Sequence, residues 1–215
     1  MVTKRWVCLD VGETLIDETR IWGTWADVLG VPRLTLFAAL GAVAAGRNDH
    51  RDVLAWFGGP DWRSRVPEVE ERYGGFRAED LYPDALRAIA ALREAGHGIA
   101  VLANQPAVRT AELRGLGVRP DVMAMSEELG VHKPDPAFFD RALVLMGDPD
   151  PADVAYVGDR VDNDVRPARL AGMRAVWIRR GPWGVLHEDT GGDADLVVRS
   201  LDELVARIDQ LWPVG

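Results

Sequence analysis

The chain has 215 residues and a formal net charge of −9, with 47% hydrophobic and 27% charged residues. Such a composition is typical of a soluble globular protein that is long enough to bury a core. The negative charge argues against nucleic acids and anionic membranes as partners, because no basic surface would balance their phosphates. The single cysteine, Cys8, excludes an internal disulfide and fits a reducing compartment. We therefore expect a cytoplasmic protein without a signal peptide or a membrane span, and no feature predicts an oligomeric state.

The first predicted element is a short apolar strand over residues 6–9, which ends at Asp10 and is followed by a tight turn. Residues 16–80 then have helical patterns, and we interpret them as a helical insert. Breaks that contain glycine divide this insert at 30–32, 46–49 and 58–60. Four tryptophans are expected to pack the insert rather than stack on a substrate: Trp22, Trp25, Trp56 and Trp62.

From residue 83 onward, strand and helix patterns alternate. The expected strands lie at 99–103, 121–125, 154–157, 175–178 and 196–198. One helix is expected with Pro83 near its start and Gly96 past its end, and the others near 107–115, 137–146, 163–171 and 201–211. Apolar strands separated by amphipathic helices predict a doubly wound, mainly parallel α/β sheet that is covered on both faces. We therefore divide the chain into an α/β core domain, residues 1–15 and 81–215, and a helical cap domain, residues 16–80. An insert at this point would lie above the carboxyl ends of the strands, where such sheets bind ligands.

Two of the predicted strands end in carboxylates. Asp10 closes the first strand, and Asp159 and Asp164 follow the strand at 154–157. The carboxyl ends of parallel strands meet at one edge of a sheet, so these side chains form a candidate site for Mg²⁺, which prefers oxygen ligands. Either segment alone has an alternative interpretation as a turn or helix cap with solvated acids. The occurrence of both at strand ends favours the metal site.

Lys133 is conspicuous because the only other lysine is Lys4, beside 23 arginines. Pro134 and Pro136 hold the chain extended after it. An ammonium placed near clustered carboxylates would balance their charge, and it could bind a phosphoryl group. The alternative is a surface lysine before the start of a helix, and the scarcity of lysine favours the site.

Asn104 follows the predicted strand at 99–103 and precedes a helix. Backbone amides at such a position can hold an anion at a helix N-terminus. A plain strand-to-helix turn explains the same segment equally well.

These segments, in this order, resemble the haloacid dehalogenase superfamily over essentially the whole chain. The segment 81–84, before a leucine-rich helix, is similar to the return from cap to core in members with a small helical cap. The resemblance implies that Asp10 is a nucleophile that forms an aspartyl-phosphate, which water later hydrolyses. It implies that Lys133 neutralises Asp10 and the transferring phosphoryl group.

The resemblance also implies the ligands of metal and phosphate. Mg²⁺ would be held by Asp10, the backbone carbonyl of Gly12, Asp159 and Asp164. The backbone amides of Gly12, Glu13 and Asn104 would form the phosphate cradle. Arg20, just past the nucleophile loop, is the cap residue expected to meet a substrate anion.

Two positions depart from the family pattern. The residue two after the nucleophile is usually an aspartate that protonates the leaving oxygen and then activates water, but here it is Gly12. Such proton transfer supplies about 10²–10⁴-fold in rate. Glu13, Asp17, Glu18, the substrate or water could replace it. Ala103 stands where a hydroxyl usually bonds a phosphate oxygen, and loss of that bond costs roughly 1–3 kcal/mol if nothing compensates.

The leading hypothesis is a Mg²⁺-dependent phosphatase for a small phosphorylated metabolite. One alternative is a catalytically weak or silent member of the superfamily that binds a phosphorylated ligand or partner, which Gly12 and Ala103 favour. Another is a 2-haloacid dehalogenase, since those enzymes also lack an aspartate two after the nucleophile. Their usual bulky aromatic at that position does not match Gly12.

Overall fold

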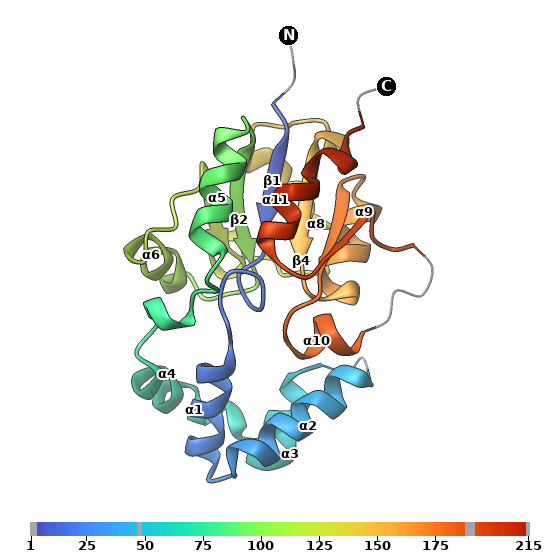
Figure 1. Ribbon diagram of the computed structural model, residues 1–215. Helices are drawn as coiled ribbons and strands as arrows, with labels where there is room; N and C mark the ends of the chain where they lie inside the picture. The colour runs from blue at the N-terminus through green and yellow to red at the C-terminus, as the bar shows by residue number, and fades with distance from the viewer. Residues whose placement is uncertain (1–3, 47–48, 188–191, 214–215) are drawn as a thin grey trace.

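The computed structural model describes residues 4–46, 49–187 and 192–213, so residues 1–3 and part of the predicted break at 46–49 lie outside the described part. Its described strands form one parallel sheet of six strands in the order β3-β2-β1-β4-β5-β6. They span Trp6–Leu9 (β1), Gly98–Ala103 (β2), Val122–Met125 (β3), Val154–Gly158 (β4), Arg174–Ile178 (β5) and Leu196–Val198 (β6). The predicted doubly wound α/β fold is confirmed. β1 lies in the centre, between β2 and β4 (Figure 1).

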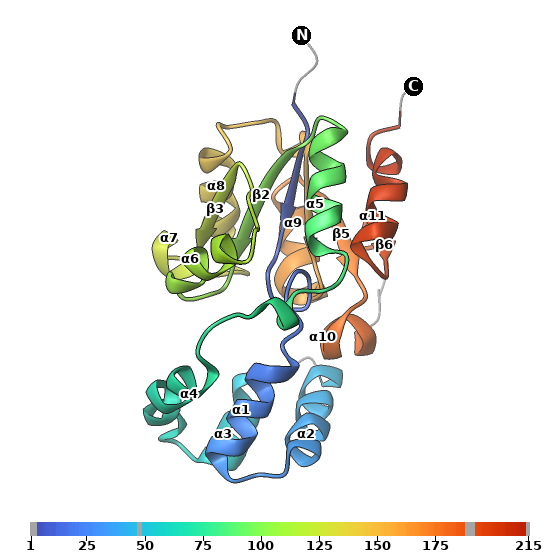
Figure 2. The ribbon, with the colours of Figure 1, turned by 60° about the vertical axis from the view of Figure 1, so that its left-hand side comes forward.

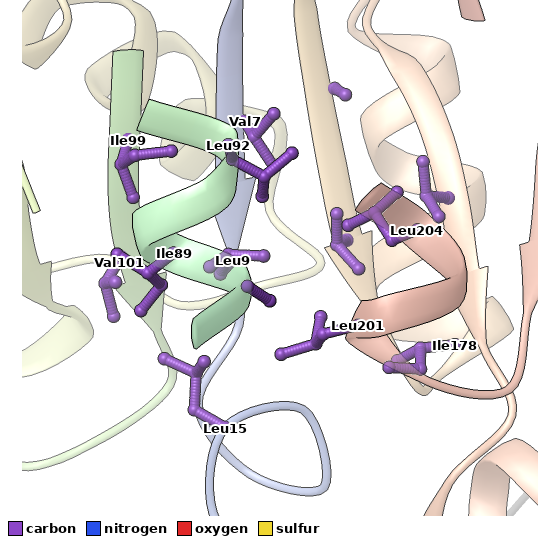
Figure 3. Close-up of a cluster of buried hydrophobic side chains, with 14 of the residues drawn as sticks. Val7, Leu9, Leu15, Ile89, Leu92, Ile99, Val101, Ile178, Leu201 and Leu204 are labelled. Carbon is purple, nitrogen blue, oxygen red and sulfur yellow. The ribbon is translucent and has the colours of Figure 1, made fainter. Parts of the chain in front are cut away.

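Helices cover both faces of the sheet because side chains alternate along each strand. Val7 and Leu9 of β1 face the cluster that includes α5 (Ala85–Glu94), α6 (Val108–Gly115) and α11 (Leu201–Arg207). Figure 3 shows leucines of α5 and α11 packed against these strands. Trp6 and Cys8 face α8 (Pro136–Leu145) and α9 (Arg166–Leu170) on the other side. Cys8 is fully buried, as its position in a strand predicted.

The segment after β1 forms four helices that lie beyond the carboxyl ends of the strands (Figures 1 and 2). They are α1 (Thr19–Leu29), α2 (Arg33–Ala45), α3 (Arg51–Gly58) and α4 (Val66–Tyr73). Gly30, with φ of 68°, ends α1, and Pro32 then starts α2. No single helix in the described part has the length and apolar composition to cross a membrane; only α1 and α2 together do, and they are bent by 116°.

This helical insert has a hydrophobic cluster of its own. Trp22, Trp25 and Trp62 are buried in it, as predicted. Trp56 is 59% exposed, so its predicted packing role is wrong. Trp183 joins the cluster from α10 (Gly181–Leu186), which follows β5 and lies beside α2 (Figure 2).

The chain enters and leaves the insert side by side. Ile16 pairs with both Gly12 and Leu81, and the Tyr82 amide donates to the carbonyl of Leu15 at 2.9 Å. Two short helices were not predicted from the sequence: α7 (Ser126–Leu129), which has a single turn, and α10, whose Gly-Pro start resembles a turn. The predicted helix at 163–171 begins as a π-helix, Val161–Val165, which then continues into α9.

Candidate active site

Asp10 lies at the carboxyl end of β1, in the middle of the sheet. Its amide donates to the carbonyl of Val157 in β4 at 2.9 Å, so the hydrogen bonds of the sheet hold the backbone as far as Asp10. The residue is only 8% exposed. Its carboxylate lies at the edge where the strands end, near Asp159 and Asp164.

Lys133 meets Asp10 at this edge. Its Nζ lies 2.8 Å from Oδ1 of Asp10 and 2.5 Å from Oδ1 of Asp164, with 1% of its side chain exposed. Asn104 holds the backbone of Lys133 from β2: the Asn104 Nδ2 donates to the Lys133 carbonyl at 2.9 Å, and the Lys133 amide donates to Oδ1 at 2.8 Å. The Asn104 side chain therefore positions the lysine.

Asp159 and Asp164 complete a group of buried carboxylates. One oxygen from each of Asp10, Asp159 and Asp164 lies within 4.8 Å of the others. Asp164 passes directly over Gly158, where an added Cβ would lie 2.5 Å from the Asp164 Cγ. Glycine is required there for this close approach. The Arg160 amide donates to Oδ2 of Asp164 at 3.0 Å and fixes the second oxygen.

The charges of this group are not balanced by the protein alone, since Lys133 supplies one positive charge to three carboxylates. Burial raises the pKa of Asp10 to about 6, although Lys133 lowers it. Burial and the nearby Asp164 and Asp10 raise the pKa of Asp159 well above its usual value. Burial alone would lower the pKa of Lys133, but the two carboxylates raise it above its ordinary range. An all-oxygen, negatively charged cluster of this kind fits a hard divalent cation.

The loop after Asp10 differs from the predicted phosphate cradle at Glu13. The Glu13 amide donates to the carbonyl of Ile16 at 2.7 Å, so it is not free for an anion. Its carboxylate accepts from the Tyr82 hydroxyl at 2.5 Å and from the Glu18 amide at 3.2 Å. Glu13 has a φ of 51°, which closes the tight turn. The assignment of Glu13 to the cradle is therefore corrected; in the described part, the Gly12 amide has no acceptor.

Glu18 occupies the space beside Gly12. A Cβ on Gly12 would lie 2.5 Å from Glu18 Oε1 and 2.9 Å from its Cδ. Burial, followed by the charges of Glu13 and Asp10, raises the pKa of Glu18 to about 8, while hydrogen bonds from Trp22 and Gln105 lower it. A carboxyl group thus stands close to the position that lacks one in the sequence.

Arg20 does not belong to this site, contrary to the expectation from its position in the sequence. Its guanidinium binds Asp80 with two nitrogens, at 2.8 and 2.5 Å. It also donates to the carbonyls of Tyr73 and Gly75 at 2.6 and 2.5 Å. These partners use its donors at the base of the insert, and Arg20 does not line the cleft at Asp10. The expectation that Arg20 binds a substrate anion is therefore corrected.

A cleft of about 730 Å³ opens above Asp10, between the sheet and the insert. Its floor includes Asp10, Lys133 and Asp159, and the insert contributes aromatic side chains, Trp22, Trp25 and Trp62. His132, exposed beside Lys133, also lines it.

At one end of the cleft, the His50 ring lies edge-on to Trp22 and Trp183, with centroids 5.8 and 6.0 Å away. Burial lowers the pKa of His50 to about 4. The sequence did not indicate that Trp183 and Arg160 would line this cleft, because Trp183 comes from α10 after β5 and Arg160 from the loop after β4.

The comparisons with known proteins identify the family and the fold of the chain. Residues 4–172 match the family of haloacid dehalogenase-like hydrolases. The chain belongs to this family. Phosphoserine phosphatase of Thermus thermophilus is 35% identical over 195 residues, which cover 84% of this hydrolase and 76% of that protein. Glyceraldehyde 3-phosphate phosphatase of Methanopyrus kandleri is 40% identical over 105 residues, 47% of this chain and 45% of that protein.

Solved structures of the family share the fold of this hydrolase. L-2-haloacid dehalogenase of Xanthobacter autotrophicus superposes with a TM-score of 0.70 and 18% identity, covering 95% of this chain and 98% of that one. This likeness concerns the fold alone. The reaction has to be argued from the side chains at Asp10.

Proposed function

We propose that this hydrolase is a Mg²⁺-dependent phosphatase that acts on a small phosphorylated metabolite. The observation that carries the proposal is the buried contact of Asp10 with Lys133, at the edge where Asp159 and Asp164 also lie. A phosphoryl group is an anion, and its transfer to a carboxylate needs positive charge at the site of reaction. The names of the two relatives specify phosphoserine and glyceraldehyde 3-phosphate, both small phosphorylated compounds.

Each residue has a role in this proposal. An oxygen of Asp10 attacks phosphorus and forms an aspartyl-phosphate, which water then hydrolyses. Lys133 neutralises Asp10 and the transferring group from its buried position, 1% exposed. The amides of Gly12 and Asn104 form the phosphate cradle. Ala103 adds no hydroxyl to this cradle, since its side chain is buried and apolar.

A magnesium ion fits the carboxylate cluster. Asp10, the carbonyl of Gly12, Asp159 and Asp164 would hold it, and the oxygen-only donor set suits this hard cation. When bound, Mg²⁺ supplies positive charge to the phosphoryl oxygens.

The helical insert supports the proposed division into a core, residues 1–15 and 81–215, and a cap, residues 16–80. It has its own hydrophobic cluster and it lines the cleft. We propose that the cap selects the substrate. A cleft of about 730 Å³ fits a small metabolite rather than a macromolecule. The single, fully buried cysteine, Cys8, is consistent with a cytoplasmic enzyme.

Hydrolysis of p-nitrophenyl phosphate with added Mg²⁺ tests the proposal. We expect activity that is lost when Mg²⁺ is chelated and that falls on the order of 10⁴-fold or more in Asp10→Asn, because the nucleophile is removed. Chloride release from a 2-haloacid without added metal would instead support a dehalogenase. Magnesium binding without hydrolysis of any phosphate in a metabolite panel would support a binding role.

A further inference from the structure

The inference concerns the proton-handling group that the sequence lacks at Gly12. Oε1 of Glu18 lies 2.5 Å from the Cβ position of residue 12. In an aspartate, the Cβ and a carboxylate oxygen are separated by about 2.4 Å, the span of a C–C and a C–O bond. One oxygen of Glu18 therefore stands as far from that Cβ position as the oxygen of an aspartate at residue 12 would.

Glu18 is held in this place by its surroundings. It is the residue that precedes α1, and its amide donates to Glu13 Oε1 at 3.2 Å. Trp22, one turn later, donates from Nε1 to Oε2 at 3.4 Å. The other oxygen, Oε1, remains on the side of Gly12, and Glu18 lines the same cleft as Asp10.

The other nearby carboxylates are occupied elsewhere. Both oxygens of Glu13 accept hydrogen bonds, from the Tyr82 hydroxyl and the Glu18 amide. Asp17 accepts from the Thr19 amide at 2.8 Å and lines a different pocket, beside Arg20. Of the three carboxylates that the sequence offers as replacements, Glu18 is the one with an oxygen next to Gly12.

We propose that Glu18, the residue just before α1, is the general acid and base of this hydrolase and replaces the aspartate that is missing at residue 12. This inference rests on the proposed phosphatase function. It adds a catalytic residue that lies six positions further along the chain than the one usual in the family.

The proton balance is complete with Glu18 alone. As Asp10 forms its bond to phosphorus and the bond from phosphorus to the leaving oxygen breaks, the Glu18 carboxyl gives its proton to that oxygen, and an alcohol leaves. Glu18 is then a carboxylate. It takes one proton from the water that attacks the aspartyl-phosphate, the bond between Asp10 and phosphorus breaks, and hydrogen phosphate leaves with Glu18 protonated again.

The test compares leaving groups in Glu18→Gln, which keeps the shape but cannot transfer the proton. With glycerol phosphate, whose alkoxide needs a proton, we expect kcat/KM to fall about 10²–10⁴-fold. With p-nitrophenyl phosphate, whose leaving group needs none, we expect kcat/KM to fall less than about 10-fold. Because hydrolysis of the aspartyl-phosphate also lacks its base, we expect a burst of nitrophenol followed by slow turnover.

Asp17→Asn is the matched control, since it removes a carboxylate one residue away that lies outside the cleft at Asp10. We expect its kcat/KM to stay within about twofold of wild type for both substrates.

A second variant moves the carboxyl group back. Gly12→Asp alone would bring its Cβ to 2.5 Å from Glu18 Oε1, so the two side chains compete for one space. In Gly12→Asp combined with Glu18→Ala this conflict is removed. We expect the double variant to hydrolyse glycerol phosphate at least about 10-fold faster than Glu18→Ala alone. Circular dichroism and thermal unfolding show that each variant is folded.

The outcomes separate the two proposals. If the wild type is active and Glu18→Gln lowers kcat/KM equally for both substrates, without a burst, the role of Glu18 is overturned. The proposed phosphatase function then still stands. A fall in kcat/KM for glycerol phosphate alone in Asp17→Asn also overturns the role of Glu18. A wild type without Asp10-dependent hydrolysis of either phosphate overturns the proposed function, and the role of Glu18 with it.

Discussion

The two sides of the cleft, a floor at the sheet and a roof formed by the insert and α10, differ in their side chains. The floor consists of charged residues at the edge where the strands end, Asp10, Lys133 and Asp159, which are 8%, 4% and 4% exposed. The roof consists of tryptophans and polar side chains from the insert, together with Trp183 of α10. Buried charges bind one another through direct ion pairs, whereas the roof is held by apolar packing. The proposed nucleophile, Asp10, therefore lies at the end of a sheet strand, whereas the insert contributes Glu18 and the aromatic side chains.

The largest effect on stability is expected from removing the buried cation of the floor, Lys133. Lys133→Met leaves buried carboxylates without their cation, and we expect a loss of about 3–5 kcal/mol in the free energy of unfolding, measured with urea. Lys4→Met is the matched control, because Lys4 is half exposed and its ion pair with Asp121 spans 3.7 Å. We expect less than about 1 kcal/mol there. Equal stabilities of the two variants would show that the floor does not depend on this cation.

A smaller effect is expected from displacing the carboxylate of Asp164, which is paired with Lys133. In Gly158→Ala, the new methyl group would lie 2.5 Å from the Cγ of Asp164, so that side chain or the strand must move. We expect a loss of about 1–3 kcal/mol in stability and weaker Mg²⁺ binding, measured by calorimetry. Gly115→Ala, which meets no atom within 4 Å, is the control and should leave both unchanged or raise stability slightly. Unaltered Mg²⁺ affinity in Gly158→Ala would argue against Asp164 as a ligand.

The base of the insert gives the third test. Arg20→Met removes the hydrogen bonds to Asp80, which is 4% exposed, and to two backbone carbonyls. We expect a loss of about 1–2 kcal/mol in stability and an unchanged KM for p-nitrophenyl phosphate. Arg33→Met, which breaks an exposed pair with Asp27, should cost less than about 1 kcal/mol. A large rise in KM for Arg20→Met would return Arg20 to the substrate site.

The smallest effect on stability is expected from His50, a histidine in the roof of the cleft. Burial and the cations Arg160 and Arg51 lower the pKa of His50 to about 4, against the opposing charges of Asp49 and Asp162. The unfolded chain therefore binds this proton more readily, so stability is complete above about pH 6.5 and is lost as the pH falls toward 4.

His50→Phe should remove this part of the pH dependence, measured by urea unfolding at about pH 7 and about pH 5. The effect is small because 40% of the His50 side chain is exposed. An NMR titration of His50 in the folded protein at or above about 6.5 would contradict this view of the roof.

Residues that act through local patterns could be predicted from the sequence. Asp10, Asp159 and Asp164 each follow a recognisable buried strand, and parallel strands present their carboxyl ends at one edge. Lys133 was recognisable because lysine is rare in this chain. The doubly wound fold follows from the same alternation of strands and helices, whereas the order of the strands in the sheet was not predicted.

Residues whose roles depend on distant partners could not be predicted. The backbone amide of Asn104 was expected at the phosphate, but nothing in the sequence indicated that its side chain binds the backbone of Lys133, 29 residues away. Arg20 was placed at the substrate because it is close to Asp10 in sequence, but its partner Asp80 lies 60 residues further on. The expected packing of Trp56 failed because a short helix has too few turns to show which face is covered.

By itself the sequence determined the sheet, the carboxylates at its strand ends and the absence of an acid at residue 12. These features depend on the periodicity of apolar residues and on the identity of single positions. Only the tertiary structure decided which carboxylate takes the space beside Gly12. The turn over residues 13–17 brings the start of α1 back to the end of β1, and the Glu13 carboxylate and Trp22 hold Glu18 there. The direction of a side chain after such a turn depends on the contacts that receive it, and a sequence pattern does not contain those contacts.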